Sequence, residues 1–198
     1  MRILLLTAAL VVGGLVTVSA RDLPSEDEVA NATYMGSRAC RACHMTAAQG
    51  EMYKIWENSK HAKAYATLAT DEAKAIAAGL SIANPQEDAT CLKCHSTTGD
   101  VPSSRVHARF DVSEGVGCES CHGAGEHYRT KQVMCGILTG SIEGASVGLI
   151  EPNADVCATC HTGAVPEGHP AQDFDYESAV QEIAHPLPAA RAEGQGCN

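Results

Sequence analysis

The chain contains few aromatic side chains: they make up 4% of its 198 residues, with one Trp and two Phe. Aromatic and large aliphatic side chains supply most of the buried apolar surface of an ordinary domain of this size. This sequence has too few aromatic rings to build such a core. We therefore expect large non-protein groups to fill part of the interior, and we expect the fold to collapse when they are missing.

Basic residues are also scarce, since 14 Lys and Arg stand against 24 Asp and Glu and the formal net charge is -10. Nucleic acids and anionic membranes attract proteins with the opposite charge balance. The composition therefore argues against both as partners. An acidic surface is compatible with a partner protein whose docking surface is basic.

Long apolar runs are missing after the first residues of the chain. Arg2 precedes an apolar run from Ile3 to Val18, and small residues ending at Ala20 follow it. This order is typical of a secretory signal peptide, and the run is short for a membrane anchor. We predict a signal peptide at residues 1–20 and a single exported domain at residues 21–198, located in the periplasm or elsewhere outside the cytoplasm.

Patterns of common enzyme classes are missing too. The sequence shows no nucleophile motif, no phosphate-binding loop and no carboxylate pair at a recognisable spacing. It also shows no strand-rich region, and its periodic segments favour short helices separated by loops. We expect a mainly α-helical, loop-rich fold.

Cysteine, by contrast, is abundant, and eight of the ten cysteines form four C-x-x-C pairs that are each followed directly by His. Two thiols at this spacing add to the two vinyl groups of one haem, and the next residue presents an imidazole to the iron. The pattern predicts four covalently attached c-type haems. The attachment residues are Cys40 and Cys43, Cys91 and Cys94, Cys118 and Cys121, and Cys157 and Cys160, and the proximal ligands are His44, His95, His122 and His161.

Two other kinds of site use C-x-x-C pairs. Structural zinc sites do so, but zinc does not require His directly after every pair. A thioredoxin-like redox motif should occur once, at the start of a helix that follows a strand. Export fits the haem interpretation as well, and an electron carrier is a better expectation than an enzyme.

Five further histidines could supply second axial ligands: His61, His107, His127, His169 and His185. A second imidazole makes an iron suited to low-potential electron transfer, whereas an empty position permits ligand binding. His61 borders the apolar stripe of a predicted helix over Glu51–Leu68. His185 ends a second predicted helix that Asp175 should cap and Pro186 should stop.

The remaining three histidines lie in irregular segments. Glycines around His127 allow the backbone to fold closely over a ring, although a solvated loop His is the commoner case. His107 stands between Arg105 and Arg109, and His169 precedes a proline; either could simply be solvated.

Cys135 and Cys197 belong to no haem motif. In an oxidising compartment they could form a disulfide with each other or with a second molecule, and a free buried Cys135 is an equally good expectation.

Three segments resemble the tetrahaem cytochrome c-554 family. They are Trp56 with Ser59-Lys60-His61-Ala62-Lys63-Ala64, the block Gly115-Val116-Gly117-Cys118-Glu119-Ser120-Cys121-His122-Gly123, and Phe174-Asp175 with His185. The resemblance covers about residues 36–188, and the Gly-Val-Gly-Cys-Glu-Ser-Cys-His-Gly block is its most specific part. It implies a mostly helical fold around closely stacked haems and a carrier of the kind that accepts electrons from hydroxylamine oxidoreductase.

The resemblance also implies distal ligands that spacing does not assign. His127 would bind the haem of Cys40 and Cys43, His185 the haem of Cys118 and Cys121, and His61 the haem of Cys157 and Cys160.

The haem of Cys91 and Cys94 receives no distal ligand from the resemblance, because that position can lack a protein ligand in the family. An open iron there would favour a second hypothesis, reduction of a small nitrogen oxide. Here His107 or His169 could close it. A third hypothesis is a filament subunit in which a spare His binds a haem of the next molecule.

Overall fold

The computed structural model describes residues 23–161, 165–170, 174–185, 187–189 and 196–197. The predicted signal peptide, residues 1–20, and Pro186 lie outside the described residues. The described part is mainly helical and loop-rich, as the sequence predicts, and its β pairing is limited to one isolated bridge between Tyr34 and Val106.

The α-helices are short and 3-10 turns (η) separate several of them. In chain order the elements are α1 (Glu26–Ala30), α2 (Arg38–His44), η2 (Ala47–Gln49), α3 (Met52–Glu57), η3 (His61–Lys63), α4 (Ala64–Thr67), α5 (Asp71–Gly79), α6 (Ala89–His95), η4 (Ser103–Arg105), η5 (Val112–Glu114), α7 (Cys118–His122), α8 (Lys131–Leu138), η6 (Gly144–Val147), α9 (Ala154–His161) and α10 (Tyr176–Ile183).

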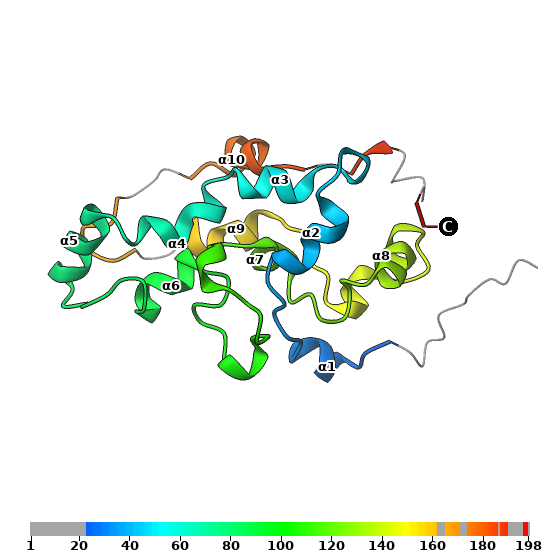
Figure 1. Cartoon of the computed structure of the whole chain (residues 1–198), viewed down its shortest axis with the longest axis horizontal. Coiled ribbons are helices and arrows are strands. Elements are labelled where there is room, and N and C mark those ends of the chain that lie inside the picture. Colours follow the sequence, from blue (N-terminus) through cyan, green and yellow to red (C-terminus); the bar gives the residue numbers. More distant parts are fainter. Residues whose placement is uncertain (1–22, 162–164, 171–173, 186, 190–195, 198) are drawn as a thin grey trace, which may run out of the picture.

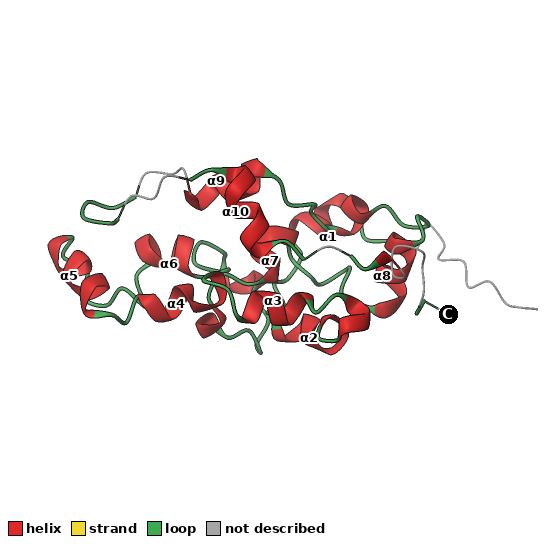
Figure 2. Ribbon diagram, turned by 90° about the horizontal axis from the view of Figure 1, so that it is seen from above, coloured by secondary structure: helices red, strands yellow, loops and turns green. Residues whose placement is uncertain are grey.

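The molecule is elongated, with α5 at one end and α8 near the other (Figure 1). Seen from above, α5, α6, α4, α3 and α2 form one row, while α9 and α10 lie in a second row across from them (Figure 2). The loop of residues 165–170, drawn between two grey traces in Figure 2, continues the second row opposite α5. Segments from distant parts of the sequence thus face each other across the long axis.

Each of the four C-x-x-C-H motifs occupies the C-terminal end of a short helix, because α2, α6, α7 and α9 all end at the motif His. Residues at i, i+3 and i+4 lie on one face of a helix. The helical conformation therefore places both thiols and the imidazole of a motif on the same side.

Two helices begin at side-chain caps, and the cap of the second, Asp175, is the one that the sequence predicts. The Thr70 side chain accepts the N–H of Ala73 at the start of α5, which ends at Gly79. The Asp175 side chain accepts the N–H of Ser178 at the start of α10.

The predicted continuous helix over Glu51–Leu68 is wrong, because α3, η3 and α4 replace it. Side chains compete with the backbone at the break. The Asn58 amide donates to the Lys54 carbonyl at 2.7 Å, and the Ser59 hydroxyl accepts the N–H of Ala62 at 3.3 Å. The break allows His61 to leave the direction of α3.

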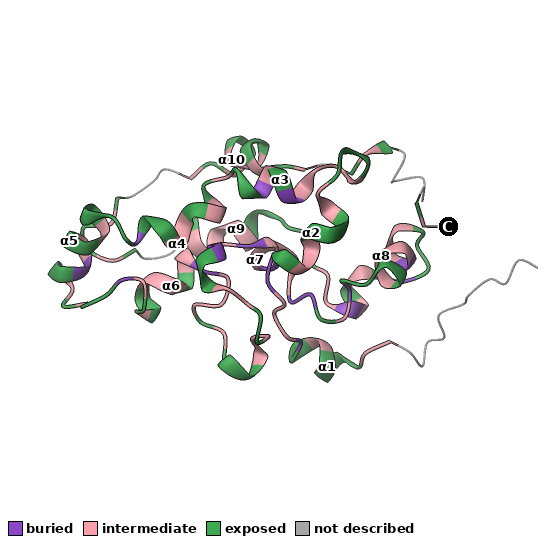
Figure 3. Cartoon of the chain, viewed as in Figure 1, coloured by how far each residue is buried: buried purple, intermediate pink, exposed green. Residues whose placement is uncertain are grey.

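The side-chain core is small. Among the described residues, a cluster of buried side chains is formed by Tyr128, Ile142 and Val147, and the other buried positions are scattered along the molecule (Figure 3). The Tyr128 hydroxyl donates to the Gly123 carbonyl at 2.6 Å, which links this cluster to the end of α7. A core of this size agrees with the low aromatic content.

Cys135 and Cys197 form a disulfide with a Cα–Cα distance of 5.4 Å, which selects one of the alternatives that the sequence left open. The bond connects α8 to the C-terminal segment across a sequence separation of 62 residues. Within the described part of the chain, the helices are too short or too polar to cross a bilayer.

Candidate functional site

The eight motif thiols form no disulfide among the described residues, and they cluster across motifs. Cys40 and Cys118 hydrogen-bond each other, which raises the pKa of the Cys40 thiol and lowers that of Cys118. Burial and the neighbouring Cys160 raise the pKa of Cys94 to about 11. The first motif thus adjoins the third, and the second adjoins the fourth.

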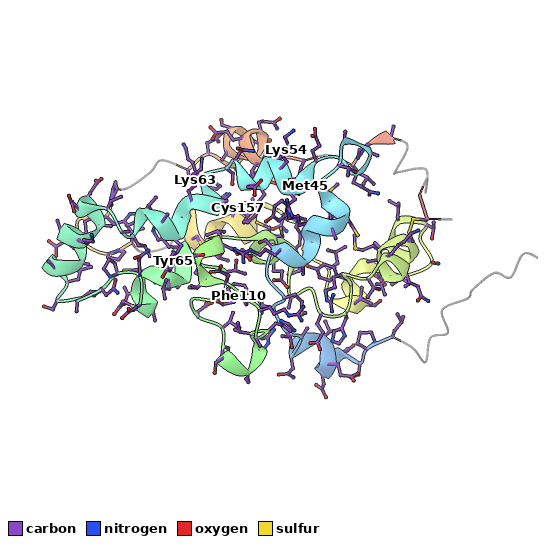
Figure 4. All side chains as sticks on the ribbon, viewed as in Figure 1. Met45, Lys54, Lys63, Tyr65, Phe110 and Cys157 are labelled. Atoms are coloured by element: carbon purple, nitrogen blue, oxygen red, sulfur yellow. A yellow bond between two sulfur atoms is a disulfide. The ribbon has the colours of Figure 1, made fainter. Side chains whose placement is uncertain are left out.

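The third and fourth motifs also lie close together. Burial, followed by the charge of Cys157, raises the pKa of Cys121 to about 11. Cys157, labelled in Figure 4, lies near the middle of the long axis. The four attachment points therefore follow one another in the spatial order first, third, fourth, second.

Three of the motif histidines face a second histidine from a distant segment. The ring centroids are 6.0 Å apart for His61 and His161, 5.9 Å for His122 and His185, and 6.1 Å for His95 and His169. The rings meet edge to face, at 73°, 69° and 67° respectively.

This separation is what two imidazoles on opposite sides of one metal ion require. Two metal–nitrogen bonds of about 2 Å, each extended by about 1 Å from the nitrogen to its ring centre, separate the centroids by about 6 Å. The His61–His161 and His122–His185 pairs are the ones that the family resemblance implies. The His95–His169 pair could not be assigned from the sequence.

Hydrogen bonds leave one ring nitrogen of these histidines available. Among the motif ligands, Nδ1 of His95 lies 2.8 Å from the Ala64 carbonyl and Nδ1 of His122 lies 3.2 Å from the Ile150 carbonyl. Nδ1 of His185 lies 2.9 Å from the Ile183 carbonyl. A proton on Nδ1 places the lone pair on Nε2, which is the common arrangement in metal-binding histidines.

The first motif differs from the other three. His44 Nδ1 lies 3.1 Å from the Met52 sulfur, and His127 Nε2 lies 3.3 Å from the Glu28 carbonyl. A proton on Nε2 of His127 would leave Nδ1 as its free nitrogen. The implied pairing of His127 with His44 stays a prediction.

Burial favours the neutral form of two of the paired histidines, His61 and His122. Desolvation, with a smaller contribution from His161, lowers the pKa of His61 below its usual value. Desolvation likewise lowers the pKa of His122, and His185 acts in the same direction. Lys60 and Lys63, which flank His61, are exposed while His61 is half-buried, so the histidine points inward (Lys63 is labelled in Figure 4).

The Gly115-Val116-Gly117 segment positions His61. The Val116 N–H donates to the His61 carbonyl at 3.0 Å, and the Trp56 indole N–H donates to the Val116 carbonyl at 2.8 Å. Gly115 has φ +70°, and a Cβ there would lie 2.7 Å from the His61 carbonyl oxygen. The residues before the third motif therefore fix the position of His61, which faces His161 of the fourth motif.

Two buried carboxylates join the segment before the first motif to the third motif. Glu119 accepts the N–H groups of Met35 at 2.8 Å and Gly36 at 2.7 Å, and Glu114 accepts that of Ser37 at 2.6 Å. Burial raises the pKa of both acids, although these hydrogen bonds act in the opposite direction. Nothing in the sequence indicates this role, because isolated Glu residues are ordinarily exposed.

One aromatic ring packs on a motif ligand. Phe174 stacks on His161 with ring centroids 4.5 Å apart and an interplanar angle of 15°. The stacked ring restricts the rotation of the His161 side chain.

Exposed apolar surface borders the histidine pairs. A hollow of about 400 Å³ is lined by Leu80, Ile82, Thr90, Lys93, Val165 and Pro166, beside the second motif. Val165 is 45% exposed, and Ile150, whose carbonyl lies next to His122, is 46% exposed. A flat apolar ring bound between the histidines would cover such surface.

The donor set therefore fits haem c. Eight unpaired thiols stand at the required spacing, and three imidazole pairs stand at the required separation. The described residues contain no group of three or more His, Cys, Asp or Glu arranged to hold a bare metal ion.

Comparison with known proteins agrees with this reading. Residues 38–123 match the family model described as cytochrome c554 and c-prime. The chain is 32% identical over 121 residues to cytochrome c-554 of Nitrosomonas europaea, covering 59% of this chain and 49% of that protein.

Two other relatives come from Geobacter sulfurreducens. The C-type polyheme cytochrome OmcC is 35% identical over 110 residues, which are 48% of this chain and 13% of that protein. The C-type polyheme cytochrome OmcB is 27% identical over 111 residues, which are 53% of this chain and 12% of that protein. The chain thus spans about half the length of the first relative and a small part of the other two. No solved structure matches it.

Proposed function

Because residues 38–123 belong to the cytochrome c554 and c-prime family of c-type cytochromes, we propose that the chain is an exported tetrahaem cytochrome that passes single electrons between partner proteins. The observation that carries the proposal is the repeated unit itself: four helix ends that each present two thiols and an imidazole, with second imidazoles facing three of them. Haem c supplies a reversible one-electron iron couple when it is bound.

The chain's own residues hold and orient the four groups. Cys40, Cys43, Cys91, Cys94, Cys118, Cys121, Cys157 and Cys160 form the thioether bonds in this proposal, and His44, His95, His122 and His161 are the proximal ligands. His61, His127 and His185 are distal ligands of the fourth, first and third haems. Carbonyl groups that accept from Nδ1 keep the rings of His122 and His185 in one orientation, which limits rearrangement when the charge on the site changes.

Proximity of the attachment points supports a relay. The contacts of Cys40 with Cys118, of Cys121 with Cys157 and of Cys94 with Cys160 bring neighbouring groups close together in a continuous order. This arrangement suits entry of an electron at one end of the elongated molecule and its exit at the other.

The proposed partners are redox proteins with a basic docking surface, because the chain carries a formal net charge of -10. Export, cleavage after residue 20 and a periplasmic location are part of the proposal and rest on the N-terminal sequence. Association with such a partner should slow as the salt concentration rises.

The test is intact-mass spectrometry of the full chain, expressed with its own leader in a host that matures c-type cytochromes. The expected mass is that of the chain from about residue 21 plus four haems, and a C91A/C94A variant should lose one of them. A product with fewer than four porphyrins would refute the tetrahaem proposal. A product that retains residues 1–20 would refute cleavage alone.

Reduction by a basic redox protein, followed by stopped-flow absorbance at several salt concentrations, tests the carrier role. We expect all four haems to be reduced and reoxidised without loss of spectrum. A protein that receives no electrons from any basic or neutral one-electron donor would contradict that role.

A further inference from the structure

The second motif has a histidine partner that no sequence feature assigned. His169 faces His95 with a centroid separation of 6.1 Å and an interplanar angle of 67°. The other two facing pairs have separations of 6.0 and 5.9 Å and angles of 73° and 69°. The pair at the second motif is therefore built to the same geometry as the pairs at the third and fourth.

The hydrogen bonding of His169 presents the appropriate nitrogen. Its Nδ1 lies 3.0 Å from the Pro170 carbonyl, as Nδ1 of His185 lies 2.9 Å from the Ile183 carbonyl. On the other side, Nδ1 of His95 lies 2.8 Å from the Ala64 carbonyl. Both rings of the pair thus keep Nε2 as the atom with a free lone pair.

A defined turn holds His169 in place. The His169 N–H donates to the Pro166 carbonyl at 3.0 Å, and Gly168, at the third position of this turn, has φ +81°. Gly supplies the positive φ that a type II turn requires at that position. A Cβ on Gly168 would lie 3.9 Å from Ile76 of α5, so the turn lies beside that helix. Val165 and Pro166 line the hollow beside the second motif.

His107, the rival ligand, is committed elsewhere. Its Nδ1 accepts the N–H of Arg109 at 3.1 Å, so the neutral ring carries its proton on Nε2. Its backbone N–H donates to the Tyr34 carbonyl at 2.9 Å, beside the Tyr34–Val106 bridge. Within the described part of the chain, His107 makes no ring contact with another histidine.

We propose that Nε2 of His169 is the distal axial ligand of the haem on Cys91 and Cys94, opposite His95. The inference rests on the proposed tetrahaem function. It makes the second haem six-coordinate and low-spin, so that a small molecule cannot bind its iron without displacing His169. It also removes the basis for a nitrogen oxide reductase at that haem and makes the second site a member of the electron relay.

The experiment is electron paramagnetic resonance of the fully oxidised holoprotein, combined with carbon monoxide titration of the fully reduced holoprotein. H169G should gain one high-spin ferric haem per chain relative to the wild type. It should also bind one more carbon monoxide per chain than the wild type does. H107G, the matched control, should match the wild type in both measurements.

Added imidazole should return the H169G spectrum to low spin, because it restores the missing ligand without the side chain. A variant that merely misfolds would not recover in this way. An H169G variant that matches the wild type in both measurements, or an H107G variant that gains a high-spin haem, would overturn the proposal.

Mass spectrometry of the same samples separates this inference from the tetrahaem proposal. Four attached haems with an open second iron refute the His169 ligand alone. Absence of haem from Cys91 and Cys94 refutes the tetrahaem proposal instead.

Discussion

Replacing the buried carboxylate of Glu119 by an amide should destabilise the holoprotein. Glu119 lies inside the third motif and is 3% exposed. Its Oε1 accepts the N–H groups of Met35 at 2.8 Å and Gly125 at 2.6 Å, and its Oε2 accepts that of Gly36 at 2.7 Å. The side chain thus satisfies three backbone donors on both sides of the contact between the first and third motifs.

In Glu119→Gln the amide has one oxygen and an NH2 group in place of the two oxygens. When the amide oxygen takes the position of Oε1, the NH2 group faces the N–H of Gly36, and two donors are left without an acceptor. A stranded buried polar group costs about 1–3 kcal/mol. Burial of the Glu119 carboxylate is unfavourable, as its raised pKa indicates. The uncharged amide avoids this penalty, which offsets part of the cost of the stranded donors. We expect the free energy of unfolding to fall by about 3 kcal/mol.

Equilibrium denaturation by guanidinium, followed by haem absorbance, measures this change, since thioether-bound haems stay with the chain. The control is Glu126→Gln, because the exposed Glu126 accepts a single N–H, that of Thr33 at 2.7 Å, and an amide oxygen can keep that bond. The control should lose less than about 1 kcal/mol. Equal losses in the two variants, or a loss below about 0.5 kcal/mol in Glu119→Gln, would refute the reasoning.

Three further substitutions test other contacts of the structure. His61→Ala should turn one haem in four high-spin in the electron paramagnetic resonance spectrum while Lys60→Ala does not, and an unchanged spectrum would exclude His61 as a ligand. In Gly115→Ala the new side chain would have to adopt the positive φ of this position, and its Cβ would meet the His61 carbonyl. The variant should lower the free energy of unfolding by at least about 1–2 kcal/mol and perturb the same haem signal. Cys135→Ser opens a loop of 62 residues and should lower the free energy of unfolding by about 4 kcal/mol; a loss that persists when both proteins are compared in reductant would show another cause.

The features that could be predicted from the sequence are those whose cause is local. Each attachment motif holds two thiols and an imidazole within five residues, and the structure places each motif at the end of a helix. Thioether attachment at these residues stays a prediction that needs no distant contact. Thr70 and Asp175 cap their helices through contacts with residues three positions on, which a sequence displays directly.

Features that depend on competition between local and distant contacts were harder to predict. Apolar periodicity over Glu51–Leu68 predicted a single helix, and Tyr53, Trp56 and Leu68 are indeed buried. The hydrogen bonds of Asn58 and Ser59 end α3 nonetheless. The disulfide of Cys135 was one of several open alternatives, because its partner lies in a segment without periodicity.

The partners of the motif histidines are the least local feature, and His169 illustrates why. A histidine in a Pro- and Gly-rich loop has the composition of a solvated turn, and nothing in its neighbours marks it as a ligand. Its role depends on where the loop lies relative to α6, and the loop lies beside α5 and lines the hollow next to the second motif. A haem at the proposed second site would lie between this loop and α6, so side-chain periodicity carries little of the information. Under the proposed ligation, one loop histidine decides whether the second iron is open or closed, and two chains that share all four attachment motifs can differ at this point in what they do.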